Sequence, residues 1–175
     1  AWNWSPFNMS WITLEIIQKH FCMDALRQSS IDFAVITTRL PTWQRHIYTN
    51  RQEIDMVAAL RASNLIPVIH SRPVLINGAL HIDGGFVDNN PLDIPLTAGC
   101  DLVLLIVNNH RGRVYRRLLP PRVDALQACQ DKVVVIHPPF PLPMRRFDFR
   151  VEKMEEVFKI GRKEAVRWLR SGRLG

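Results

Sequence analysis

Apolar residues recur at helical spacing in five stretches of the chain, two of them short. The pattern predicts helices over about residues 11–21, 24–27, 52–62, 93–98 and 148–169. Asn50 precedes the third stretch, ahead of Glu53 and Asp55. Because an amide side chain and an acidic first turn both favour a helix start, Asn50 is the candidate N-cap of that helix.

Runs rich in β-branched and aliphatic residues predict strands between these helices. They cover residues 31–40, 46–49, 74–76, 79–82, 101–107 and 132–136. Asn77-Gly78 joins the third and fourth strands, and this dipeptide is the strongest signal for a two-residue hairpin turn. The fifth strand is aliphatic from Leu102 to Val107, so we expect both of its faces to be buried. The order strand, helix, strand over residues 79–107 predicts a crossover unit.

The composition is that of one compact domain with its own core. The chain has 175 residues, of which 47% are hydrophobic and 22% charged, so residues 1–175 are expected to form a single domain. The longest apolar run, residues 102–107, is far below the roughly 20 residues that cross a bilayer, and we expect no secretory signal. Three widely spaced cysteines exclude a disulfide framework and predict a cytoplasmic protein.

Positive charge is concentrated in the carboxyl-terminal third. Residues 111–175 hold 16 Lys and Arg against 7 Asp and Glu, whereas residues 1–110 hold 7 against 9. Such a region attracts anionic headgroups, and we expect peripheral contact with a membrane surface through it. Nucleic acid is the less favoured partner, because only Tyr115, Phe147 and Phe149 place aromatic rings among the arginines. An ordinary solvated surface explains the same charges without a partner.

The segment from His81 to Pro91 is the strongest candidate for chemistry. Asp83 ends a strand and is followed by Gly84 and Gly85, whose missing side chains let the backbone turn sharply and aim the carboxylate into a cleft. The alternative is a tight turn in which Asp83 only accepts hydrogen bonds from backbone amides. His81 is two residues earlier, on the same face of the strand, where it could perturb Asp83. A solvent-facing histidine is nonetheless the expectation.

No metal site or other cofactor is predicted. The loop after Asp83 is rich in oxygen ligands, but a calcium loop would need ligands at the positions of Gly85 and Val87. The six histidines are scattered, without the spacing of metal ligands.

A series of landmarks resembles the carboxyl-terminal half of the patatin-like phospholipase family. They are Ala62-Ser63-Asn64-Leu65-Ile66-Pro67, a short hairpin, Asp83-Gly84-Gly85 with Asn90-Pro91 after it, and Ala98-Gly99-Cys100-Asp101-Leu102-Val103. The resemblance is best over residues 31–107, and residues 111–175 form a basic extension with the last helix. It implies an α/β fold with a mainly parallel central sheet flanked by helices, of which we expect this chain to be a truncated part.

In that family a serine on a Gly-x-Ser-x-Gly turn attacks a lipid ester, and the aspartate of an Asp-Gly-Gly or Asp-Gly-Ala motif accepts the serine proton without a histidine. The resemblance therefore implies that Asp83 is the proton acceptor. It also implies that Gly84, Gly85, Asn90 and Pro91 shape the motif loop, and that the substrate is a lipid ester.

The family's nucleophile is missing from this chain. None of the first 77 residues is a glycine, so neither the strained serine turn nor the glycine-rich oxyanion loop can precede Asp83. Ser63 is interpreted as a packing and capping residue. We expect a fragment of a serine/aspartate lipid acyl hydrolase that is inactive alone; the alternative is a non-catalytic basic domain that binds a lipid surface or nucleic acid. A truncated sheet would also expose an edge and favour self-association.

Overall fold

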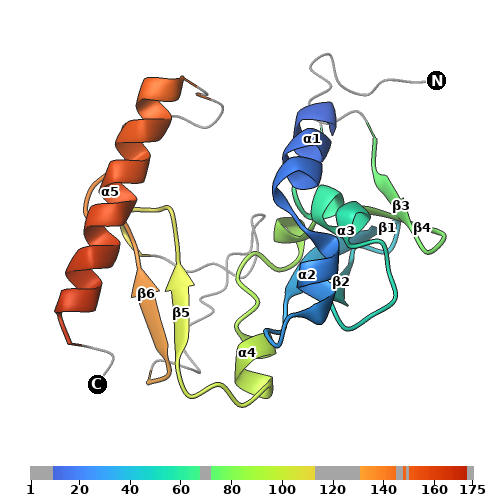
Figure 1. Ribbon diagram of the computed structural model, residues 1–175, viewed down its shortest axis with the longest axis horizontal. Helices are drawn as coiled ribbons and strands as arrows, with labels where there is room; N and C mark the ends of the chain where they lie inside the picture. Colours follow the sequence, from blue (N-terminus) through green and yellow to red (C-terminus); the bar gives the residue numbers. More distant parts are fainter. Residues whose placement is uncertain (1–9, 68–71, 113–130, 145–147, 149, 173–175) are drawn as a thin grey trace. The chain divides into compact units, whose positions relative to one another are not determined.

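The computed structural model describes residues 10–67, 72–112, 131–144, 148 and 150–172 (Figure 1). The chain divides into two compact units. The first contains the residues up to Pro91, and the second begins at Leu92. The expected single domain over residues 1–175 stays a prediction, because two compact units can belong to one domain.

The first unit is an antiparallel sheet with helices. Its elements are α1 (Ser10–His20), α2 (Met23–Gln28), β1 (Ala34–Leu40), β2 (Gln44–Thr49), α3 (Met56–Ser63), β3 (Val74–Ile76), β4 (Ala79–Asp83) and the 3-10 turn η1 (Gly84–Phe86). The strand order is β2-β1-β4-β3, and every neighbouring pair is antiparallel. The predicted turn between β3 and β4 is confirmed, since Asn77 and Gly78 have left-handed φ angles of 47° and 76°.

Helix α3 packs on this sheet and brings small side chains into the core. It begins after Asp55, whose carboxylate accepts a hydrogen bond of 3.1 Å from the Ala58 N–H. Ala59 and Ala62 are fully buried, so the helix can approach the strands closely. Helix α1 contacts α3. The buried residues of this core are Ile17, Val35, Tyr48, Met56, Ala58, Ala59, Leu60, Ala62, Leu65, Val74, Ile76 and Ile82.

The prediction that Asn50 caps α3 is wrong. The buried Asn50 side chain accepts a hydrogen bond from the Phe33 N–H (2.9 Å) and donates to the carbonyls of Leu26 (2.9 Å) and Ile31 (3.1 Å). The Asn50 side chain is thus occupied by three backbone groups of the preceding segment. The helix starts later, at Met56, and Asp55 is its N-cap.

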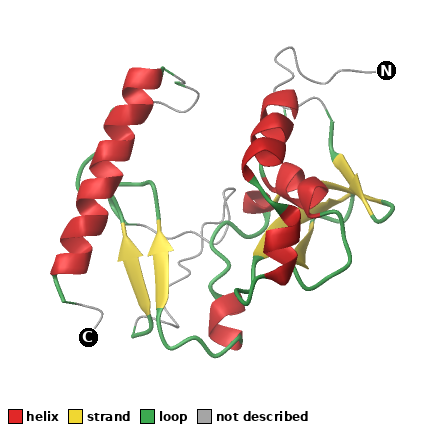
Figure 2. Ribbon diagram, in the orientation of Figure 1, coloured by secondary structure: helices red, strands yellow, loops and turns green. Residues whose placement is uncertain are grey.

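The second unit has a parallel pair of strands between helices. Its elements are α4 (Asp93–Thr97), β5 (Val103–Ile106), β6 (Val133–Ile136) and α5 (Val151–Arg170). Strands β5 and β6 pair in parallel, with Val103 opposite Val133, and α5 lies alongside β6 (Figure 2). The small core consists of Leu92, Val103 and Val133, with Leu96, Leu105, Val107 and Val135 packed against it.

Three expectations about the sheet are wrong for the described part of the chain. The central sheet is not mainly parallel: four of the six strands form the antiparallel sheet, since two tight hairpins dictate antiparallel pairing there. Strands β4 and β5 belong to different sheets, so the segment between them is not a crossover within one sheet. Strand β5 buries one face only, and Ile106 on the other face is 78% exposed.

Candidate functional site

Asp83 stands at the end of β4, opposite Thr37 of β1. Its backbone is fixed on both sides, because its N–H donates to the Leu65 carbonyl (3.1 Å) and its carbonyl accepts a hydrogen bond from the Thr38 hydroxyl (2.7 Å). The residue is partly buried, and its Oδ1 accepts a hydrogen bond of 2.7 Å from the Gly85 N–H. These contacts hold the carboxylate in one orientation at the strand end.

Gly84 lets the chain turn directly against β1. A Cβ at this position would lie 2.6 Å from the carbonyl carbon of Ile36 and 2.8 Å from its Cγ2, which is closer than real Cβ atoms approach. The Gly84 carbonyl then accepts hydrogen bonds from the N–H groups of Val87 (3.0 Å) and Asp88 (2.8 Å). No side chain fits at this position unless β1 moves, so the turn after Asp83 depends on glycine.

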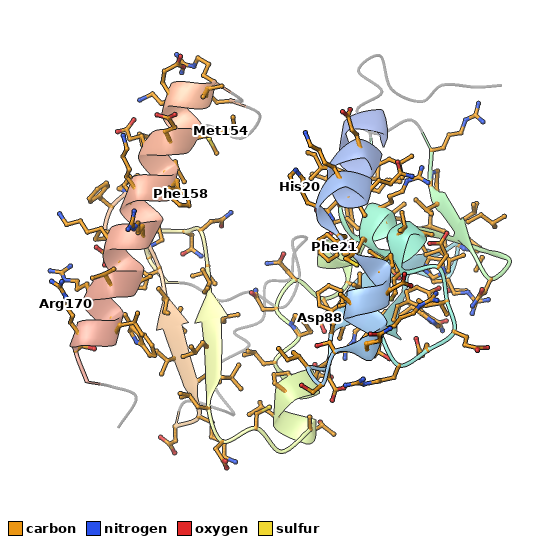
Figure 3. All side chains as sticks on the ribbon, in the orientation of Figure 1. His20, Phe21, Asp88, Met154, Phe158 and Arg170 are labelled. Atoms are coloured by element: carbon orange, nitrogen blue, oxygen red, sulfur yellow. The ribbon has the colours of Figure 1, made fainter. Side chains whose placement is uncertain are left out.

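An ion pair that sequence reasoning missed anchors the following loop to β2. Nη1 of Arg45 lies 2.5 Å from Oδ2 of Asp88, and the two side chains are 21% and 2% exposed; Asp88 is labelled in Figure 3. Trp43, in the turn between β1 and β2, packs edge-on against Phe86, with ring centroids 6.1 Å apart. The β1–β2 hairpin therefore holds the loop at two points. A separation of 43 residues leaves no local signal by which the ion pair could have been found.

Asn90 and Pro91 are partly buried at the far end of this loop. The structure therefore brings Asp83, Gly84 and Gly85 together in one turn and places Asn90 and Pro91 beyond it, where the first unit ends. Their role in shaping the motif loop stays a prediction.

His81 is buried, with 1% of its surface exposed, so the expectation of a solvent-facing histidine is wrong. Its Nδ1 lies 2.9 Å from the Thr37 hydroxyl and its Nε2 lies 3.1 Å from the Tyr48 hydroxyl. The ring of His46 packs 5.5 Å from that of His81. Burial lowers the pKa of His81, and the electrostatic influence of His46 and Arg39 lowers it further. The ring is covered by side chains of the next two strands in the sheet order, Thr37 of β1 and His46 and Tyr48 of β2.

Three of the described serines make local contacts to the backbone. Ser63 donates to the Leu60 carbonyl (3.0 Å) at the end of α3, as expected for a capping residue. Ser171 donates to the Trp168 carbonyl (2.6 Å) after α5, and Ser29 accepts a hydrogen bond from the backbone two residues on. These are the contacts of helix and turn ends, and they give none of these hydroxyls the setting of a nucleophile.

Within the described ranges, no group of three or more His, Cys, Asp or Glu side chains is arranged to hold a metal ion. Nor is any helix there long and apolar enough to cross a membrane. Among the predicted basic residues, Arg150 donates two hydrogen bonds to Asp148 (2.8 and 2.7 Å), which lower the pKa of that carboxyl to about 2. The basic residues that lie outside the described residues are Arg113, Arg116, Arg117, Arg122, Arg145, Arg146 and Arg173.

Comparison with protein families identifies the class. The family model of the patatin-like phospholipases matches residues 4–96, just over half of the chain. The matched region runs from α1 through the antiparallel sheet and the glycine turn into α4. A comparison with curated proteins found no match. The chain belongs to the patatin-like phospholipase family, which confirms the resemblance seen in its sequence and assigns it to the lipid acyl hydrolases.

Proposed function

We propose that this chain supplies the proton-accepting aspartate of a serine-type lipid acyl hydrolase. In this mechanism the Asp83 carboxylate takes the proton of a serine hydroxyl while the serine Oγ bonds to the carbonyl carbon of a lipid ester. The leaving alcohol then takes that proton as the ester bond breaks. Water hydrolyses the acyl-serine in a second step, again with Asp83 as the base.

The observation that carries this proposal is the way Asp83 is held. A carboxylate at the end of a strand, partly buried and oriented by the Gly85 N–H, is preorganised to accept a proton from a group placed beside it. The turn at Gly84 and the backbone contacts of Asp83 already restrict the side chain. Less conformational entropy is therefore lost when Asp83 binds a partner. The family match is the second support, because it covers this turn.

The proposed nucleophile is a serine outside this chain. No glycine precedes Gly78 in the sequence, and a Gly-x-Ser-x-Gly turn requires glycines around a strained serine. Without the nucleophile and the oxyanion donors, only residual effects of binding remain, so this chain is expected to be inactive alone. The proposed protein is thus a longer hydrolase of which this chain is one part.

We place this hydrolase in the cytoplasm, with peripheral contact to a membrane that holds its substrate. Cys22 and Cys100 are free and exposed thiols, which supports a reducing compartment. The 16 basic residues of the carboxyl-terminal third support attraction to anionic lipid.

The test compares this chain with a longer polypeptide, which also contains the residues encoded upstream of it in the same reading frame. Both are assayed for release of fatty acid from phosphatidylcholine and for labelling by a fluorophosphonate, which reacts with activated serines. We expect hydrolysis and one labelled serine in the longer polypeptide and neither in the shorter one. Labelling of this chain alone would contradict a missing nucleophile, and a longer polypeptide without either activity would contradict the hydrolase assignment.

A further inference from the structure

Helix α5 has two apolar faces, only one of which is packed. The partly buried positions follow each other in steps of three or four and mark the packed side, where α5 contacts β6; they are Lys153, Val157, Ile160, Glu164 and Trp168. A second stripe along the helix is exposed, and it consists of Val151, Met154, Phe158, Ala165 and Leu169. Phe158 is 69% exposed and Leu169 is 59% exposed. The apolar residues that recur at helical spacing in this segment therefore belong to two faces of α5, one packed against the core and one exposed.

Positive charge without acidic partners adjoins the exposed stripe. Within the described residues, Glu156 pairs with Lys153 and Glu164 lies within ion-pair distance of Arg167. By contrast, the other exposed cations of α5 form no ion pair among the described residues; they are Lys159, Arg162, Lys163 and Arg170. Figure 3 labels Met154, Phe158 and Arg170 along this helix.

Arg162 occupies the centre of this arrangement. It stands four residues after Phe158, four before Val166 and seven before Leu169, so helical geometry places all four on one side of α5. In a contact with protein, such a guanidinium among apolar side chains would need a carboxylate partner. At a lipid surface its apolar stem lies among the acyl chains while the charged group reaches the phosphates.

We propose that α5 lies on an anionic lipid surface, with Phe158 and Leu169 inserted at the boundary of headgroups and acyl chains and the adjoining cations on the phosphates. An amphipathic helix with apolar residues on one side and Lys and Arg beside them has the composition of an interfacial helix. The inference rests on the proposed function only in the choice of lipid as the partner, and it requires no catalytic role for Asp83. The proposal assigns membrane contact to α5. From the sequence alone, the mixed charges of this helix indicate only ordinary ion pairing within a helix.

The test is co-sedimentation of the chain with vesicles of phosphatidylcholine, with and without phosphatidylserine. We expect stronger binding to the vesicles that contain phosphatidylserine, and a decrease when salt is raised. Phe158→Asp is expected to lower the partition coefficient about tenfold or more, since it removes an inserted ring. Arg162→Gln is expected to lower it about fivefold, the factor for one basic side chain near such a surface.

Matched variants control for general loss of apolar area or charge. Leu75→Asp changes an exposed leucine of β3, and Lys19→Gln removes an exposed cation of α1; both are expected to bind vesicles like the unmodified chain. Circular dichroism checks that α5 remains folded in the Phe158→Asp variant. If the helix is lost, the Phe158→Ala variant is used instead, because alanine favours helix.

Unchanged vesicle binding in the Phe158 and Arg162 variants would overturn the proposal. A change of oligomeric state in Phe158→Asp, without a change in vesicle binding, would assign the stripe to a contact between copies and would also overturn it. Asp83→Asn separates this inference from the proposed function, since it is expected to bind vesicles normally whatever its effect on hydrolysis.

Discussion

The Arg45 guanidinium and the Asp88 carboxylate lie 2.5 Å apart and join β2 to the loop that follows Asp83. Arg45→Met would leave the Asp88 carboxylate buried without this cation. We expect it to lower the free energy of unfolding by about 2–3 kcal/mol, less than the 3–5 kcal/mol of fully buried pairs because Arg45 keeps some solvent contact. Urea denaturation followed by circular dichroism measures this loss.

The exposed pair of Arg51 and Asp32, at 2.7 Å in the same unit, supplies the control. Because exposed pairs contribute little, Arg51→Met is expected to cost less than about 1 kcal/mol. Equal losses in the two variants would contradict a special role of the Arg45–Asp88 pair in holding the loop.

The turn at Gly84 gives a second prediction. In Gly84→Ala the new Cβ meets the backbone of Ile36, and we expect a loss of about 1–3 kcal/mol in the free energy of unfolding, as for other overpacked sites. Gly161→Ala is the matched substitution, since nothing lies within 4 Å of a Cβ there and the residue is inside α5. It is expected to stabilise the helix by about 1 kcal/mol. Thermal melts of both variants should therefore shift in opposite directions, and a shift of the Gly84 variant to higher temperature would contradict the steric argument.

The burial of His81 predicts a stability that depends on pH. Its pKa in the folded protein is lowered from the ordinary 6.5, first by burial and then by the electrostatic influence of His46 and Arg39. As the pH falls, His81 therefore takes up its proton at a higher pH in the unfolded chain than in the folded protein. The stability that neutral His81 contributes is complete above pH 6.5 and is lost as the pH falls from there through the folded-state pKa.

Urea midpoints measured above and below pH 6.5 test this prediction against His81→Gln. The variant is expected to be less stable above pH 6.5, where it has lost hydrogen bonds, but to show a weaker decline on acidification. The same pH dependence in both proteins would show that other groups cause the decline.

The exposed face of β5 predicts self-association. Leu104 and Ile106 are exposed on this strand, which pairs with β6 alone among the described residues. Apolar residues beside an open strand edge favour pairing with another copy. We expect the elution volume in size-exclusion chromatography to decrease with protein concentration, and Ile106→Lys to reduce this effect. Ile31→Lys, at an exposed isoleucine outside the strands, is the control. A chain that elutes as a monomer at every concentration would contradict the prediction.

The parts of the fold that were predicted from sequence are those specified by neighbouring residues. The turn at Asn77-Gly78, the strand that ends at Asp83 and the final helix all follow from local propensity and spacing. Asp83 itself was found because a carboxylate followed by two glycines is a local pattern. Local rules of this kind are sufficient for elements, whereas sheet order depends on partners far apart in the chain.

The errors concern contacts between distant segments. The antiparallel pairing of β1 with β4, the contact of buried His81 with Thr37 and the Arg45–Asp88 ion pair each join residues 40 or more positions apart. The two faces of α5 could not be separated from sequence either, because both are apolar at helical spacing and only packing against β6 distinguishes them.

The most direct test of the central claim is the kcat/KM for ester hydrolysis of the longer polypeptide with Asp83 changed to asparagine. Asparagine keeps the size of the side chain but cannot take a proton, so kcat/KM is expected to fall by about 10²–10⁴-fold. Asp101→Asn, at an exposed carboxylate before β5, should leave it unchanged. Wild-type kcat/KM in Asp83→Asn would contradict the assignment of Asp83 as the base.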